Sequence, residues 1–179
     1  AFSGCTSLKQ IKIPSSVTLI DAKAFSECTL LTHITIPSSV SSFGDGYSPF
    51  CDCSSLEHVI FDNNSSLTSL QERLFMNLSS LTKISIPPSV ISIGTCCFNQ
   101  CDSLAEIILP PNLKEIGYCA FGSCKSLREI SLPSSLQSIG SYAFENCSSL
   151  NQIAIPSSVS KIGKSAFVNC IILKEVTLP

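Results

Sequence analysis

The sequence predicts a β-rich α/β solenoid built from about eight stacked coils of 23 residues each. Phenylalanine recurs at intervals of 23 or 25 residues along the whole chain. Leucine follows each of these phenylalanines at a distance of six residues, and isoleucine or valine follows at nine. The recurrent phenylalanines are Phe2, Phe25, Phe50, Phe75, Phe98, Phe121, Phe144 and Phe167. Because all copies share one period, we expect each to form one coil of a single array.

A short strand is the first element that each copy indicates. The run Leu-x-x-Ile-x-Ile ends in an alternation that is typical of a strand with one buried face. Proline follows at once in seven of eight copies, with Asp62 as the exception, and proline cannot donate to a strand ladder. One coil buries too little apolar surface to offset the loss of conformational entropy. Neighbouring coils should therefore pair their strands into a parallel sheet.

The rest of each copy indicates corners. Ser-Ser after the proline suits a turn. A glycine after the next apolar positions, as at Gly94, Gly117, Gly140 and Gly163, is expected where φ becomes positive at a corner. The segment Ala-Phe-x-x-Cys predicts a helical turn that places Phe and Cys on one inward face.

Two copies are longer than the others by two residues each. One insertion lies within residues 45–48 and the other within residues 62–66. In a stacked array, such insertions should protrude at corners while the rest of the coil stays in step with its neighbours.

Composition restricts the function classes. Charged residues make up 13% of the chain and the net charge is −2, which argues against nucleic-acid binding through a basic face. No apolar run approaches the ~18 residues that span a bilayer, so we expect no membrane insertion by this segment. Apolar residues, at 44%, supply the core of one domain over residues 1–179. The chain begins inside a repeat and neither end carries a cap, so we expect an excerpt of a longer array that can associate end to end.

The eleven cysteines fall into one large group and four others. Seven share one column of the repeat: Cys5, Cys28, Cys53, Cys101, Cys124, Cys147 and Cys170. We expect these thiols to be reduced and buried as small hydrophobes, although a coil spacing of about 5 Å also permits disulfides. Cys96 and Cys119 share another column on adjacent coils and are the best candidates for a disulfide. No Cys-x-x-Cys pair occurs, so no metal site or cofactor is expected.

The combined pattern Leu-x-x-Ile-x-Ile-Pro-x-x-Val-x-x-Ile-Gly-x-x-Ala-Phe-x-x-Cys resembles the BspA-like leucine-rich repeat, also called the Treponema pallidum type, over the whole chain. The resemblance implies a right-handed leucine-rich-repeat solenoid, or horseshoe, with the parallel sheet on its concave face. It also implies a surface antigen of a bacterium or protozoan, on the cell surface or secreted, that mediates adhesion or binds host matrix proteins. Leu78, Asp62 and both insertions depart from the pattern, so irregular curvature is expected over residues 43–78.

A protein partner is expected on the solvent-exposed face of the sheet, which is the usual recognition surface of a curved solenoid. One outward column changes from basic or neutral to acidic between Lys83 and Glu106, and Ile60 and Ile108 add apolar area in the next column. The predicted contact is centred on residues 58–108 and comprises His33, Thr35, His58, Ile60, Lys83, Ser85, Glu106, Ile108, Glu129 and Ser131.

The two insertions are the alternative partner surface, because departures from a repeat often carry function. Tyr47 beside Asp45 supplies an aromatic anchor, and Asp62, Asn63 and Asn64 form a polar loop.

No combination of residues indicates an enzyme. His33 and His58 share a column, but no nucleophile with an orienting partner accompanies them, so both are expected to be exposed surface residues. Two functions stay open. The first is a recognition module displayed at the cell surface for host matrix or cell-surface proteins. The second is an intracellular scaffold of the same shape, which reduced cysteines would favour.

Overall fold

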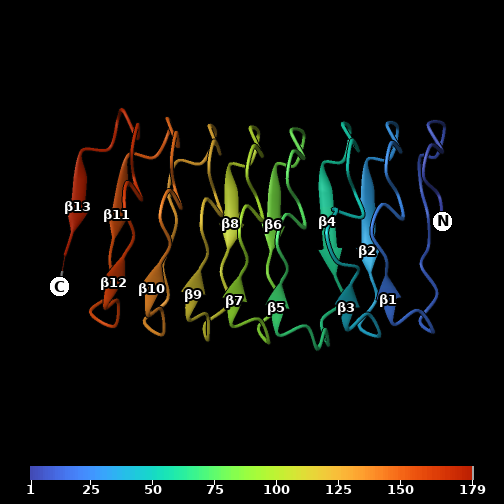
Figure 1. Cartoon of the computed structure of the whole chain (residues 1–179), viewed down its shortest axis with the longest axis horizontal. Helices are drawn as coiled ribbons and strands as arrows, with labels where there is room; N and C mark the ends of the chain where they lie inside the picture. Colours follow the sequence, from blue (N-terminus) through green and yellow to red (C-terminus); the bar gives the residue numbers. More distant parts are fainter. Residues whose placement is uncertain (179) are drawn as a thin grey trace.

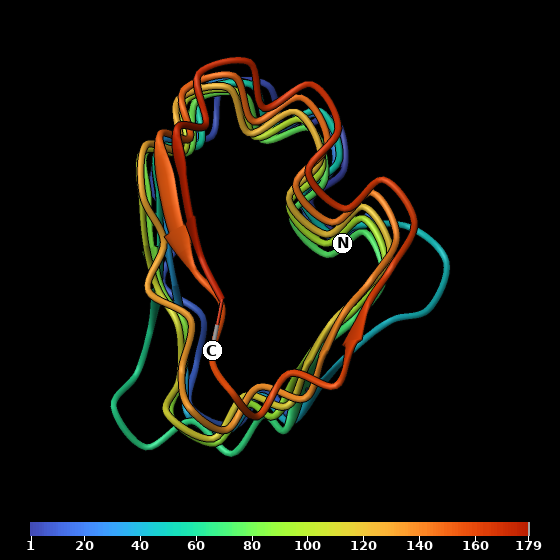
Figure 2. The same ribbon diagram turned by 90° about the vertical axis from the view of Figure 1, so that its left-hand side faces the viewer.

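The computed structural model describes residues 1–178, and Pro179, the proline expected to end the last strand, lies outside them. The coils follow one another along the long axis of the molecule in sequence order (Figure 1). Viewed along that axis, most coils trace the same outline, with two loops that leave it (Figure 2). The predicted stack of equivalent coils is therefore confirmed.

The first sheet is formed by the predicted strand of the repeat. Its strands are β2 (His33–Ile36), β4 (His58–Phe61), β6 (Lys83–Ser85), β8 (Glu106–Ile108), β11 (Gln152–Ala154) and β13 (Glu175–Thr177). All pairings are parallel, in the order β2-β4-β6-β8 and, separately, β11-β13. In β2, exposed and buried residues alternate, as period-2 patterning requires.

A second parallel sheet lies on another side of each coil and was not expected from the sequence. Its two-residue strands are β1 (Leu19–Ile20), β3 (Ser42–Phe43), β5 (Ser69–Leu70), β7 (Ser92–Ile93), β9 (Glu115–Ile116), β10 (Ser138–Ile139) and β12 (Lys161–Ile162). They pair in the orders β1-β3 and β12-β10-β9-β7-β5. Within residues 1–178 there is no helix, so the two sheets and the turns between them make up each coil.

The recurrent phenylalanines form one internal stack, as the repeat predicts. Successive ring centroids lie between 5.2 and 6.0 Å apart, and every interplanar angle in the stack is 24° or less. The two wider spacings, 5.9 and 6.0 Å, occur on either side of Phe50, in the part of the chain that contains the insertions. Five of these rings, from Phe50 to Phe144, are fully buried.

The cysteine column is bonded to the phenylalanine column. The Cys101 thiol donates to the Phe75 carbonyl oxygen of the preceding coil at 3.1 Å, and the Cys124 thiol donates to that of Phe98 at 3.3 Å. Cys28, Cys53, Cys147 and Cys170 make the same bond. Cysteine therefore supplies both a small apolar side chain and a weak donor that links adjacent coils.

The corners differ from the expectation. Gly94, Gly117, Gly140 and Gly163 do not have positive φ; instead their coils approach so closely that a Cβ on Gly117 would lie 2.8 Å from the Gly94 carbonyl carbon. Positive φ occurs two residues before and two residues after the recurrent phenylalanine, for example at Cys96 (52°) and Gln100 (61°). The Ala-Phe-x-x-Cys segment is consequently a pair of hydrogen-bonded turns rather than a helical turn.

Candidate functional site

The outward face of the first sheet presents the side chains that the sequence predicts. Strand register aligns His33 with His58, Lys83 with Glu106, and Ser85 with Ile108 on neighbouring strands. All ten residues of the predicted contact are solvent-exposed: His33, Thr35, His58, Ile60, Lys83, Ser85, Glu106, Ile108, Glu129 and Ser131. Glu129 and Ser131 lie in a segment that does not form a strand, so the sheet is interrupted between β8 and β11.

A groove of about 490 Å³ opens in this face between β4 and β6. One wall carries His58, Ile60 and Asn63, and the other carries Lys83 and Pro88. The pairing of the two strands explains the opening. β2 and β4 share four register pairs and β6 and β8 share three, but β4 and β6 share one, between His58 and Lys83.

The second insertion accounts for the divergence of these strands. After β4, the chain remains bound to the preceding coil, because the Asp62 N–H donates to the Ile36 carbonyl oxygen at 3.0 Å. The Ser38 N–H donates in turn to the Asp62 carboxylate at 3.3 Å. The strand end is thus held away from β6, and the expected irregularity over residues 43–78 takes the form of a groove.

Charge changes sign across the middle of the face, as predicted. The Lys83 ammonium lies 2.6 Å from the Glu106 carboxylate, and both side chains are about half exposed. Ile60 and Ile108 are 51% and 48% exposed; Ile60 lies on β4, next to the strand of Lys83, and Ile108 lies on β8 with Glu106. Exposed ion pairs contribute little to stability, so their main effect is on the electrostatic field that a partner meets.

The two insertions do not form one surface. In Figure 2 they leave the common outline of the coils on different sides. Asp62 and Asn63 line the β4–β6 groove, so they belong to the sheet face. Tyr47 lies apart from the groove, is 62% exposed and receives the Lys23 ammonium 4.1 Å above its ring. Asn64 and Asp45 are exposed residues of the same two loops.

The cysteines of the buried column are structural in their environment. All eleven cysteines are free. Cys96 and Cys119, the candidates for a disulfide, are therefore not linked to each other in this structure. Burial raises the pKa of Cys53 to about 12, and it raises the pKa of Cys124 far above its ordinary range. A thiol that stays protonated is a poor nucleophile and a poor metal ligand.

Over residues 1–178, no cluster of three or more His, Cys, Asp or Glu side chains could hold a metal ion. His33 has a neutral neighbour, since its Nδ1 lies 3.1 Å from the Thr32 hydroxyl. The two histidines are exposed, as predicted. In the same part of the chain, no helix has the length and apolarity needed to cross a bilayer.

Stacked coils of 23 residues with a parallel sheet define the chain as a leucine-rich-repeat solenoid. It belongs to the family described as the BspA type leucine rich repeat region, which matches residues 1–84 and 68–179 in six copies. The resemblance drawn from the repeat pattern is thereby confirmed. No curated protein sequence matches significantly.

Two solved structures illustrate what the chain is similar to. The Treponema pallidum leucine rich repeat protein is 35% identical over 84% of this chain and 61% of its own, with a TM-score of 0.65. A leucine rich cell surface protein from Faecalibacterium prausnitzii is 30% identical over 98% of this chain and 55% of its own, also with a TM-score of 0.65. The chain therefore spans less than two thirds of the length of these proteins. The pneumococcal vaccine antigen PcpA, at 24% identity and a TM-score of 0.56, shares the fold.

Proposed function

We propose that this chain is a non-enzymatic protein-recognition module of a cell-surface protein, and that it binds a host matrix or cell-surface protein through the exposed face of β2, β4, β6 and β8. The observation that carries the proposal is the β4–β6 groove, where two strands and an inserted loop together form a hollow of about 490 Å³. The relative from Faecalibacterium prausnitzii, which is described as a cell surface protein, supports the location.

The side chains around the groove indicate what kind of partner it suits. Ile60 and Pro88 offer apolar contact, and the groove is wide enough for an aliphatic or aromatic side chain. Lys83 and Glu106 place opposite charges side by side at one edge. A partner should therefore insert one apolar anchor and present a charge pair of the opposite order, because complementary charges fix register and increase the association rate.

Exchanging the two charged residues tests this face. The double variant Lys83→Glu with Glu106→Lys keeps the ion pair but reverses its direction, so folding should be unchanged while affinity for the partner falls by at least about tenfold. The partner is first sought by screening matrix and cell-surface proteins for binding to the wild-type chain.

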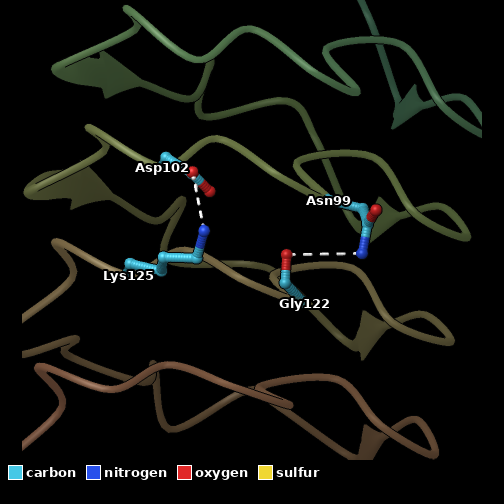
Figure 3. Close-up of polar contacts among 4 residues, drawn as sticks. All are labelled: Asn99, Asp102, Gly122 and Lys125. Atoms are coloured by element: carbon cyan, nitrogen blue, oxygen red, sulfur yellow. Dashed lines mark hydrogen bonds and ion pairs between the residues drawn. The ribbon is translucent and has the colours of Figure 1, made fainter.

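A second ion pair supplies the matched control. The Lys125 ammonium lies 2.8 Å from the Asp102 carboxylate on the adjacent coil (Figure 3), and neither residue lines the groove. Exchanging Lys125 and Asp102 should leave binding unchanged. Equal affinity of both exchanged variants and the wild type would remove the sheet face from consideration.

The loop around Tyr47 is a second candidate surface. Tyr47 is exposed and held beside Lys23, and exposed aromatic residues are enriched in protein interfaces. A Cβ on Gly46 would meet no atom within 4 Å, so the loop tip stands free. Deleting Asp45 and Gly46 should leave the coils intact; loss of binding in that variant, with normal binding by the exchanged Lys83 and Glu106, would favour this loop.

An intracellular scaffold of the same shape is the second candidate function. The free state of all eleven cysteines favours it, because reducing compartments keep thiols unpaired. Titration of thiols in unreduced protein taken from its natural source discriminates the two: a full set of free thiols supports the scaffold, and an oxidised set supports surface display.

A further inference from the structure

Cys96 and Cys119 lie side by side on adjacent coils, outside the buried cysteine column. Each precedes its recurrent phenylalanine by two residues, and the backbones match, with φ of 52° and 50°. The Cys96 N–H donates to the Tyr118 carbonyl oxygen at 2.8 Å, which keeps the two coils in register beside the thiols. The two side chains occupy the same position on adjacent coils, and each thiol is near enough to perturb the pKa of the other. Adjacent coils are about 4.8 Å apart, within the Cα separation that a disulfide spans.

A third side chain holds the buried member of the pair. The Asn99 amide donates from Nδ2 to the Cys119 sulfur at 3.1 Å and to the Gly122 carbonyl oxygen at 3.3 Å. Figure 3 shows this amide directed from its own coil toward Gly122 on the next. Gly122 leaves the necessary space, since a Cβ there would lie 2.6 Å from Asn99 Nδ2. Asn99 and Cys96 belong to the same coil, so the contact draws the Cys119 sulfur toward the coil that carries Cys96.

The seven-membered column provides an internal contrast. Cys101 and Cys124 also occupy equal positions on adjacent coils, but both are fully buried and both donate to backbone carbonyl oxygens at 3.1 and 3.3 Å. Oxidising such a pair would break two hydrogen bonds in a closed core. Cys96 is half-buried and reachable from solvent, and Cys119, although 8% exposed, lies directly behind it.

We propose that Cys96 and Cys119 are a reversible disulfide site for a low-molecular-weight disulfide such as oxidised glutathione, with Asn99 as the positioning residue. The Cys96 thiolate attacks one sulfur of the oxidant, which forms a mixed disulfide on Cys96 and releases one thiolate of the oxidant. The Cys119 thiol, whose pKa is raised to about 11 by burial, then loses its proton and attacks the Cys96 sulfur, which closes the cross-coil disulfide and releases the second thiolate. The two released thiolates take up the two protons that the protein thiols lose, so the oxidant is reduced as the protein is oxidised.

Oxidation of the native chain by glutathione disulfide tests the proposal. Trypsin cleavage after Lys83, Lys114 and Lys125 separates residues 84–114, which contain Cys96, from residues 115–125, which contain Cys119. The oxidised protein should yield these two peptides joined, and dithiothreitol should separate them. Absence of the joined species after prolonged oxidation, or a mixed disulfide on Cys96 that never closes, would overturn the proposal.

Variants identify the sulfurs. Cys96→Ser, at a half-buried position, should abolish the joined species, whereas Cys97→Ala, at the buried neighbouring position, should retain it. A cross-link that persists in Cys96→Ser would assign the reaction to other cysteines and refute the site. Asn99→Ala should slow closure about tenfold, the effect of losing one hydrogen bond to an ionised group, while the first adduct on Cys96 forms at the wild-type rate. Equal slowing of both steps would refute the positioning role.

Discussion

Replacing Phe98 with alanine tests the idea that the central stack of rings holds the coils together. Phe98 is fully buried, and its ring lies 5.3 Å from that of Phe75 and 5.3 Å from that of Phe121. Alanine would remove the ring from both neighbouring coils and leave a cavity that rigid coils cannot close.

The expected loss of stability can be worked from these contacts. Truncating a buried phenylalanine to alanine typically costs about 3–5 kcal/mol. Each aromatic pair contributes about 0.5–1.5 kcal/mol beyond burial, and Phe98 makes two such pairs, so the upper part of that range is expected. Phe2 is the matched control, since it is 40% exposed and stacks on one ring, that of Phe25 at 5.5 Å. Phe2→Ala should cost about 1 kcal/mol.

Urea unfolding followed by far-UV circular dichroism measures both variants. Because stability in a solenoid is a sum of coil and interface terms, Phe98→Ala should lower the midpoint strongly and can divide the transition into two phases. A loss below about 2 kcal/mol for Phe98→Ala, well under the range for buried rings, would refute the reasoning. So would equal losses for Phe98→Ala and Phe2→Ala.

Three further predictions concern the packing of the coils. Gly117→Ala should destabilise the protein by about 1–3 kcal/mol, because the added methyl group overpacks against the preceding coil. Gly46→Ala should cost less, because only the positive φ of 90° opposes a side chain there. Thermal melts of the two variants compare these losses of stability. Cys124→Ala should cost more than Cys124→Ser, because serine retains a donor for the Phe98 carbonyl oxygen, and urea midpoints would contradict this if their order were reversed. The contribution of Cys53 to the stability of the reduced protein should be constant below pH 9 and fall as pH rises above it, since its pKa is raised from 9.0 to about 12 and only the unfolded chain releases that proton in between. Urea midpoints at pH 8 and 10 measure the fall, and a flat profile would contradict it.

The features that depend on the period alone could be predicted from the sequence. Equal intervals between copies superimpose equal side chains, so the phenylalanine stack, the cysteine column and the outward columns with His58 and Lys83 follow directly. The expectation that all seven column thiols are buried is wrong at the two end coils, where Cys5 is exposed and Cys170 is half-buried. The second sheet could not, because its strands, such as β7, are two residues long and too short to show an alternation.

Other features depend on how neighbouring coils approach each other, which a sequence pattern does not express. A recurrent glycine marks a position that does not tolerate a side chain, and either a positive φ or close contact with another backbone can be the reason. At Gly117 the cause is contact with the preceding coil. The second insertion was visible at residues 62–66, but its effect on β4 and β6 depends on the hydrogen bonds that Asp62 makes to one coil rather than the other.

Because Asp62 bonds to the preceding coil and not to β6, we attribute the groove to the second insertion. Removing the insertion tests this explanation. Deleting Asn63 and Asn64 returns the third copy to 23 residues, the length at which β6 and β8 keep three register pairs. The shortened strand connection should bring the end of β4 onto β6 and close the hollow of about 490 Å³. The amide hydrogens of Phe61 and Ser85, which alternate with residues bonded to β2 and β8, face β6 and β4. They should then exchange more slowly than in the wild type, and binding of a sheet-face partner should be lost although the fold is at least as stable. Unchanged exchange at these amides would show that the divergence of β4 and β6 arises elsewhere in the coil.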